Sequence, residues 1–290
     1  RHPHRPRPDD HVVDVDDRVH ALIRAVRVRL VNGPYDTGTV HGKRARRRLL
    51  RTHNGRVGEN EEPQAGGAPL AATSDEPLAH PDPHRATVLV VGVVATVLFV
   101  MLRFAVALGG HDPLAVDIWW DDAMLAGLTD VGLVIAWVPS VIGGVVGAPV
   151  VGILIIAIFL WRRRWWDAVT LAVAIVTVTA IGAPMAAIIA RVRPSDSLAE
   201  SMATSFPSGH TAVATTIAVT LGLLLRRWYV WTLGVIWVAW MMWSRTYLHA
   251  HWASDVLAGL LEGIAVACLV WSAAQAYRVR RARRSSPPGG

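Results

Sequence analysis

Long apolar runs alternate with short polar or basic segments from about residue 87 to the end of the chain. A run of roughly 20 apolar residues is long enough to cross the hydrocarbon core of a membrane as a helix. Six candidate spans occupy 87–110, the later part of 131–160, 168–190, 211–225, 228–243 and 256–276. The pattern therefore predicts an all-α fold, a polytopic membrane protein of about six transmembrane helices.

Two parts of this region depart from a simple span. Residues 112–130 mix tryptophan and leucine with several aspartates, which predicts an amphipathic helix lying in the membrane interface. Residues 131–160 are too long for one straight span, and proline or glycine interrupts them at positions 139, 143, 144, 147 and 149. We expect the span in the later two-thirds of this segment, with its first part packed at the outer surface.

Residues 1–86 have a different composition. They hold none of the 13 tryptophans, which all lie at or after Trp119, and they are rich in Arg, His, Asp, Pro and Gly. No segment among them has an apolar face long enough to build a core, and no signal-peptide pattern is present. The expected organisation is a disordered cytoplasmic N-terminal region (1–86), a six-helix membrane domain (87–277) and a basic cytoplasmic tail (278–290).

The net charge of +7 comes largely from basic clusters at 162–164, 226–227 and 278–284. With six spans these clusters fall on one side, which the positive-inside rule assigns to the cytoplasm. We interpret them as membrane flanks and expect no nucleic-acid partner. The polar loops 191–206 and 244–254 then face the outside of a multi-pass cell-membrane protein.

The two outer loops carry groups suited to holding an anion. Three arginines lie on the side where the positive-inside rule disfavours them: Arg191, Arg193 and Arg245. A guanidinium can grip phosphate oxygens as a planar fork. The segment Ser208-Gly209-His210 directly precedes an apolar run, and the free backbone N–H groups and dipole at a helix N-terminus also bind anions.

His251 and Asp255 add a pair that can do chemistry. They are four residues apart at the predicted start of the last span, so they share one helix face. A carboxylate bonded to one ring nitrogen fixes the tautomer and leaves the other nitrogen as a nucleophile. His210 can protonate a leaving oxygen. Since the sequence displays no Asp/Glu/His cluster with metal-ligand spacing, we expect phosphoryl transfer without a metal or another cofactor.

These residues resemble the three motifs of the type 2 phosphatidic acid phosphatases, or lipid phosphate phosphatases. The family pattern is Lys-x6-Arg-Pro, then Pro-Ser-Gly-His, then Ser-Arg-x5-His-x3-Asp. The second motif is complete at 207–210 and the third at 244–255, whereas the first keeps Arg193-Pro194 but has Ala186 at the lysine position. The resemblance covers about residues 87–277 and implies an outer-face active site in a six-helix membrane fold.

The resemblance also implies a role for each matching residue. His251 attacks phosphorus to give a phosphohistidine, Asp255 orients it, and His210 is the general acid. The phosphate is held by the family's remaining motif residues, here Arg193, Ser208, the Gly209 N–H and Arg245. The implied activity is metal-independent hydrolysis of a lipid phosphate in the membrane, of the phosphatidic acid or polyprenyl diphosphate class.

Ala186 is the departure that leaves alternatives open. Arg191 lies five residues later and could reach the phosphate from the loop, so we include it among the candidate phosphate ligands. A catalytically weak relative that binds or transports lipid is the main alternative. A vanadate-dependent haloperoxidase would use the same anion pocket, but those enzymes are soluble and the six spans argue against one. The sequence leaves the substrate and the oligomeric state open.

Overall fold

The computed structural model describes residues 83–199 and 204–285, all of which lie in one compact unit starting at Thr73. Disorder was expected for residues 1–86. Residues 1–82 lie outside the described residues, whereas residues 83–86 form the first turn of α2, so the expectation is wrong for those four residues. Within the described ranges the chain forms α-helices and one isolated β-bridge, between Val192 and Thr204, with no β-strand. The helices are α2 Pro83–Leu108, α3 Ala115–Ala126, α4 Asp130–Ile142, α5 Gly147–Trp161, α6 Trp165–Ile189, α7 Gly209–Leu225, α8 Trp228–Tyr247 and α9 Ala253–Ser285. The all-α class expected from the sequence is confirmed.

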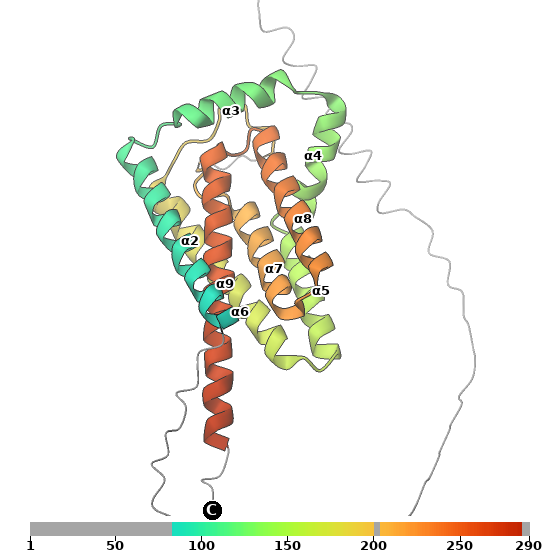
Figure 1. Ribbon diagram of the computed structural model, residues 1–290. Helices are drawn as coiled ribbons and strands as arrows, with labels where there is room; N and C mark the ends of the chain where they lie inside the picture. The colour runs from blue at the N-terminus through green and yellow to red at the C-terminus, as the bar shows by residue number, and fades with distance from the viewer. Residues whose placement is uncertain (1–82, 200–203, 286–290) are drawn as a thin grey trace, which may run out of the picture. The chain divides into compact units, whose positions relative to one another are not determined.

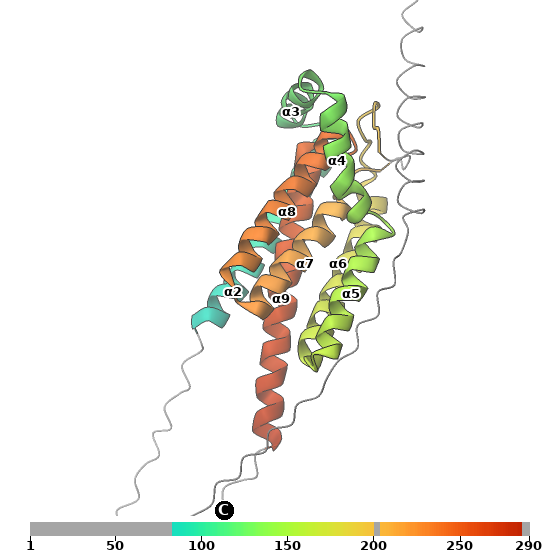
Figure 2. The ribbon, with the colours of Figure 1, turned by 90° about the vertical axis from the view of Figure 1, so that its right-hand side faces the viewer.

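The long helices run alongside one another, and α3 lies across one end of them (Figures 1 and 2). α3 is the helix that the Trp and Asp pattern of 112–130 predicts, and its Trp119 side chain is exposed. α9 does not stop at Ala276, where the apolar run ends, but continues through the arginine cluster to Ser285. The first part of the expected basic tail is therefore helical.

Three helices, α2, α6 and α9, are long and apolar enough to cross a membrane by length and composition. The bent pair α4 and α5 makes a fourth if it counts as one span. Six spans were expected. α7 is apolar but has 17 residues, a length of about 25 Å, which is less than a typical hydrocarbon core. α2 exposes most of its valines, as a helix facing lipid does.

The interruption expected within 131–160 falls between α4 and α5. α4 ends at Ile142, α5 begins at Gly147, and their axes differ by 53°. A Cβ at Gly147 would lie 2.3 Å from the carbonyl oxygens of Val141 and Ile142, so only glycine fits this turn. The apolar segment is thus a bent pair of helices, as its glycines and prolines indicate.

Two glycines bring α9 against α7. A Cβ at Gly259 would lie 2.5 Å from the Ser208 carbonyl oxygen, and one at Gly263 would lie 2.6 Å from the Cβ of Thr215. Glycines four residues apart let two membrane helices approach closely. The Ser208 N–H also donates to the Asp255 carbonyl oxygen at 3.1 Å. This contact fixes the start of α7 beside the first turn of α9.

Candidate active site

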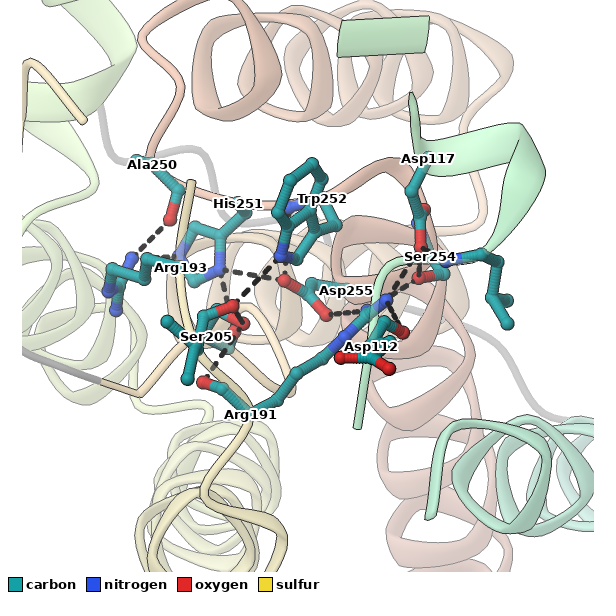
Figure 3. A network of polar contacts seen from close by, with 12 residues as sticks. Asp112, Asp117, Arg191, Arg193, Ser205, Ala250, His251, Trp252, Ser254 and Asp255 are labelled. Carbon is teal, nitrogen blue, oxygen red and sulfur yellow. Dashed lines mark hydrogen bonds and ion pairs between the residues drawn. The ribbon is translucent and has the colours of Figure 1, made fainter. Parts of the chain in front are cut away.

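The sequence motifs meet at one end of the helices. Arg193 follows α6, Ser208 to His210 open α7, Arg245 lies in the last turn of α8, and His251 directly precedes α9. Figure 3 shows Arg193, His251 and Asp255 converging on the segment around Ser205. Residues up to 62 positions apart in the sequence, Arg193 and Asp255, thus form one cluster.

The His251 ring is buried, with 3% of its surface exposed, and its two nitrogens have different neighbours. Nδ1 lies 2.7 Å from the Ser205 carbonyl oxygen, while Nε2 lies 3.3 Å from Nη1 of Arg193. Because a carbonyl oxygen only accepts hydrogen bonds, Nδ1 carries the proton and Nε2 keeps its lone pair. The structure thus selects the tautomer in which Nδ1 is protonated and Nε2 is not.

Burial lowers the pKa of His251, because the charged imidazolium loses its water. The carboxylate of Asp255 acts in the opposite direction, and the positive charges of Arg245 and Arg193 lower the pKa further. The net shift is downward from the ordinary value. His251 is therefore a neutral imidazole at neutral pH.

Asp255 does not contact His251 as the sequence predicts. Its Oδ2 lies 3.9 Å from Nδ1, too far for a hydrogen bond, and accepts instead from the Trp252 N–H at 3.0 Å. Its Oδ1 accepts from Arg191 at 2.6 Å. The group that orients the ring directly is the Ser205 carbonyl, while Asp255 shapes the turn that carries His251. Sequence reasoning missed Ser205, since every residue type supplies a backbone carbonyl.

Arg191 is also placed differently from the sequence interpretation, which made it a phosphate ligand. Its side chain is fully buried. Nη1 donates to Ser254 Oγ at 2.7 Å and to Asp255, and Nη2 donates to Asp117 Oδ2 at 2.7 Å and to the Asp112 carbonyl at 3.2 Å. Both Nη groups are therefore committed to protein acceptors, and Arg191 holds Asp255 rather than an anion.

Asp117 is a site residue that the sequence did not reveal. This carboxylate on α3 is fully buried and receives hydrogen bonds from Arg191, the Leu114 N–H, and the N–H and Oγ of Ser254. The distances lie between 2.7 and 2.9 Å. In the sequence, Asp117 appears only as an acidic residue on a predicted amphipathic helix, and the side chains of such residues usually face solvent. Asp117 instead clamps α3 onto the start of α9.

The other predicted phosphate ligands border this cluster. Arg245 is buried and donates from Nη1 to Ser140 Oγ at 2.7 Å, and the Ser208 hydroxyl lies 3.1 Å from that of Thr211. His210 is half-buried beside the α4–α5 bend, with Nε2 3.7 Å from where a Gly144 Cβ would be. Gly209 is exposed, and a Cβ there would meet no atom within 4 Å. The first turn of α7 is thus open to a ligand.

A second cluster, around His249, brings together three groups that could hold a metal ion, a set that the spacing of residues along the sequence did not show. His249 Nδ1 lies 2.8 Å from Asp121 Oδ1 and 3.6 Å from Asp196 Oδ2. The three ligand atoms lie within 4.8 Å of one another. They come from α3, the loop after α6 and the turn before α9. Sequence spacing could not show a set assembled from three segments.

Comparisons with known proteins match part of this chain. Residues 167–278 match the model of the PAP2 superfamily. The chain is 34% identical over 122 residues to an undecaprenyl-diphosphatase of Sulfolobus acidocaldarius, over 40% of this chain and 57% of that protein. The matched part thus spans little more than half of the curated relative.

Two solved structures match this chain, and the first of them has a similar fold. A PAP2-type phosphatidylglycerolphosphate phosphatase of Bacillus subtilis superposes with a TM-score of 0.56 and 20% identity, covering 65% of this chain and 96% of that one. LpxE of Aquifex aeolicus gives a TM-score of 0.49 and 22% identity, over 55% and 96% of the two chains.

The fold is that of a helical membrane protein with a cluster of His and Arg side chains at one end of its helices. The stretch that carries the second and third motifs, and the Arg-Pro of the first, lies within the family match. Residues 167–278 of this chain are therefore similar to the PAP2 superfamily, and the solved phosphatase structure is similar in fold.

Replacing Arg191 tests its assignment as a buried structural cation. Arg191→Gln leaves the carboxylates of Asp117 and Asp255 buried without their counter-charge. We expect a loss of about 3–5 kcal/mol in the free energy of unfolding, measured by unfolding in detergent. Arg193→Gln, at a half-buried arginine two residues away, is the matched control and should cost clearly less. Equal, small losses in both variants would contradict the structural role of Arg191.

Proposed function

We propose that this protein is a membrane-embedded phosphatase that hydrolyses a phosphomonoester or a diphosphate, and that its substrate is a lipid. The observation that carries the proposal is the environment of His251. Its Nδ1 proton is directed at the Ser205 carbonyl, and its Nε2 lone pair faces the Arg193 guanidinium, where a bound phosphate would lie. The names of two relatives, an undecaprenyl-diphosphatase and a phosphatidylglycerolphosphate phosphatase, support a lipid phosphate as substrate.

The proposed reaction has two steps at phosphorus. Nε2 of His251 attacks, the P–N bond forms, and the bond to the leaving oxygen breaks as His210 donates it a proton. Water then attacks the phosphohistidine, with His210 accepting a proton, and inorganic phosphate leaves. One water is consumed, and the products are the lipid alcohol, or the lipid monophosphate from a diphosphate, plus phosphate.

Three groups stabilise the negative charge of the phosphate in this scheme. Arg193 and Arg245 supply positive charge on the His251 side, and the N-terminus of α7 at Gly209 supplies backbone N–H groups. Both the ester and its pentavalent transition state carry negative charge on the oxygens that these groups face. The sequence-based expectation that the reaction needs no metal is retained in the proposal, because the arginines already provide the positive charge.

Ala186 favours one other candidate, a weakly active or inactive relative that binds lipid. Ala186 has no donor for phosphate, and Arg191 does not substitute for one because its Nη groups bind Asp117, Asp255 and Ser254. Turnover distinguishes the two candidates.

Phosphate release from lipid substrates tests the proposal. Purified protein in detergent should release phosphate from phosphatidic acid, phosphatidylglycerol phosphate or undecaprenyl diphosphate. His251→Ala should reduce turnover to background, because no other nitrogen takes the place of Nε2. His111→Ala, at an exposed histidine in the loop after α2, is the control and should retain activity. Substantial turnover in folded His251→Ala would rule out the phosphohistidine step, and no release from any of these lipids would favour the binding protein.

The same assay with a chelator addresses the metal. We expect activity to survive EDTA. Loss in EDTA that a divalent ion restores would overturn metal independence and would point to Asp121, Asp196 and His249.

The lowered pKa of His251 predicts a displaced pH profile. The neutral imidazole is the nucleophile, and its pKa lies below the ordinary value of about 6.5, so kcat/KM should fall only at pH below that value. Arg245→Gln removes a positive charge that lowers this pKa and should move the acid limb to higher pH. An acid limb above pH 7 in the wild type, or no movement in Arg245→Gln, would contradict this assignment.

The positive-inside rule places the site on the outer face of the cell membrane, and this sidedness is part of the proposal. In a Cys268→Ala background, a single cysteine at Ala199 should react with an impermeant maleimide in intact cells. A cysteine at Arg163, in the basic turn at the opposite end, should react only after lysis. The reverse pattern would place the site on the cytoplasmic side.

A further inference from the structure

A cavity of about 240 Å³ lies at the end of the helices away from the active site. The active site uses the end of α6 and the starts of α7 and α9, whereas this cavity is formed by the start of α6, the end of α7, late turns of α9 and the start of α2. The opposite ends of the same helices therefore enclose it, as their course in Figure 1 shows.

Four arginines from four helices line this cavity, against one carboxylate, that of Asp167. They are Arg85 of α2, Arg164 before α6, Arg226 after α7 and Arg278 of α9. Arginine clusters at helix ends are expected from the positive-inside rule, and most face outward. That rule does not explain why these four should border one hollow.

Asp167 positions two of the four arginine side chains but is one negative charge against four positive ones. Its Oδ2 accepts from Arg164 Nε at 2.6 Å, and its Oδ1 lies 3.9 Å from Arg278 Nη1. Nη2 of Arg164 also donates to the Leu224 carbonyl at 3.2 Å. Arg164 is thus held in place by protein contacts, and among the described residues that line the cavity positive charges outnumber negative ones. An anion would meet a partly preorganised site.

Trp271 gives an independent indication of a ligand. The side chain lines the cavity, is 4% exposed, and has the His84 ring edge-on at 5.5 Å. Its Nε1 has no hydrogen-bond acceptor among the residues that the structure describes. A buried N–H without an acceptor is unfavourable by about 1–3 kcal/mol. Nε1 itself has almost no exposed surface, so a ligand oxygen would satisfy it once the ring turns slightly toward the cavity.

The level of the cavity indicates the kind of anion. Trp161, Trp165 and Trp228 are exposed at the same helix ends, as aromatic residues are at the headgroup level of a membrane. Guanidinium forks and the N-terminus of α6 both favour phosphate oxygens. Basic pockets between helices at this level bind phospholipid headgroups. We propose that this cavity, separate from the active site, binds a phosphate group, supplied by an anionic phospholipid of that leaflet or by free phosphate.

Lipid titration of charge-matched variants tests this site. Arg226→Gln with Arg278→Gln removes two cavity arginines, whereas Arg280→Gln with Arg283→Gln removes two arginines of α9 outside the cavity. Delipidated protein in detergent would be titrated with phosphatidylglycerol, with phosphatidylcholine and with inorganic phosphate, and bound ligand measured by native mass spectrometry. Both pairs keep the active site intact, so a difference between them reports the cavity alone.

We expect the cavity pair to bind phosphatidylglycerol at least about tenfold more weakly than the wild type, since each basic group contributes severalfold. The outer pair should bind as the wild type does, and phosphatidylcholine should bind weakly to all. Trp271→Phe, which keeps the ring and loses the N–H, should weaken binding severalfold. Binding of inorganic phosphate that depends on the cavity arginines, without binding of phosphatidylglycerol, would identify free phosphate as the source. Equal losses in both arginine pairs would overturn the site and leave only a diffuse basic surface.

Discussion

The arrangement of the active site depends on one buried cation. Arg191 has no exposed surface and lies between Asp117 of α3 and Asp255 of α9. These two carboxylates are 138 residues apart in the sequence. A buried arginine without these partners would be strongly unfavourable, so the three charges can be buried only together. Their pairing fixes the first turn of α9, and with it the backbone that presents His251. It also holds α3 across the end of the helices (Figure 1).

The electrostatics of His251 and of the neighbouring arginines are coupled. Burial and the charges of Arg245 and Arg193 all lower the pKa of His251, so the groups suited to binding phosphate also keep the imidazole neutral. The Ser205 carbonyl adds tautomer control without adding charge. A carboxylate bonded directly to Nδ1 would favour the imidazolium more strongly. The 3.9 Å separation of Asp255 therefore suits a neutral nucleophile in a cationic surrounding.

Sequence reasoning succeeded where the signal is local or periodic. Apolar runs gave the helical class, Gly143 to Gly147 gave the bend between α4 and α5, and motif spacing gave the residues that meet at one end. It failed where a side chain's partner is distant or is a backbone group. The burial of Asp117 depends on Arg191, 74 residues away, and the Ser205 carbonyl has no side-chain signature. Arg191 looked like an anion ligand because its carboxylate partners could not be seen.

Ala186 changes how a phosphate would be held. The motif lysine of the lipid phosphate phosphatases is absent, and Arg191 does not replace it. In our proposal the anion is therefore bound by Arg193, Arg245 and the start of α7. Losing one charge-assisted contact weakens headgroup binding by about 1.5–3 kcal/mol. A lipid substrate tolerates this loss better than a soluble ester does, because its apolar chain already concentrates it at the membrane. The alanine is therefore more compatible with a lipid phosphate than with a soluble one.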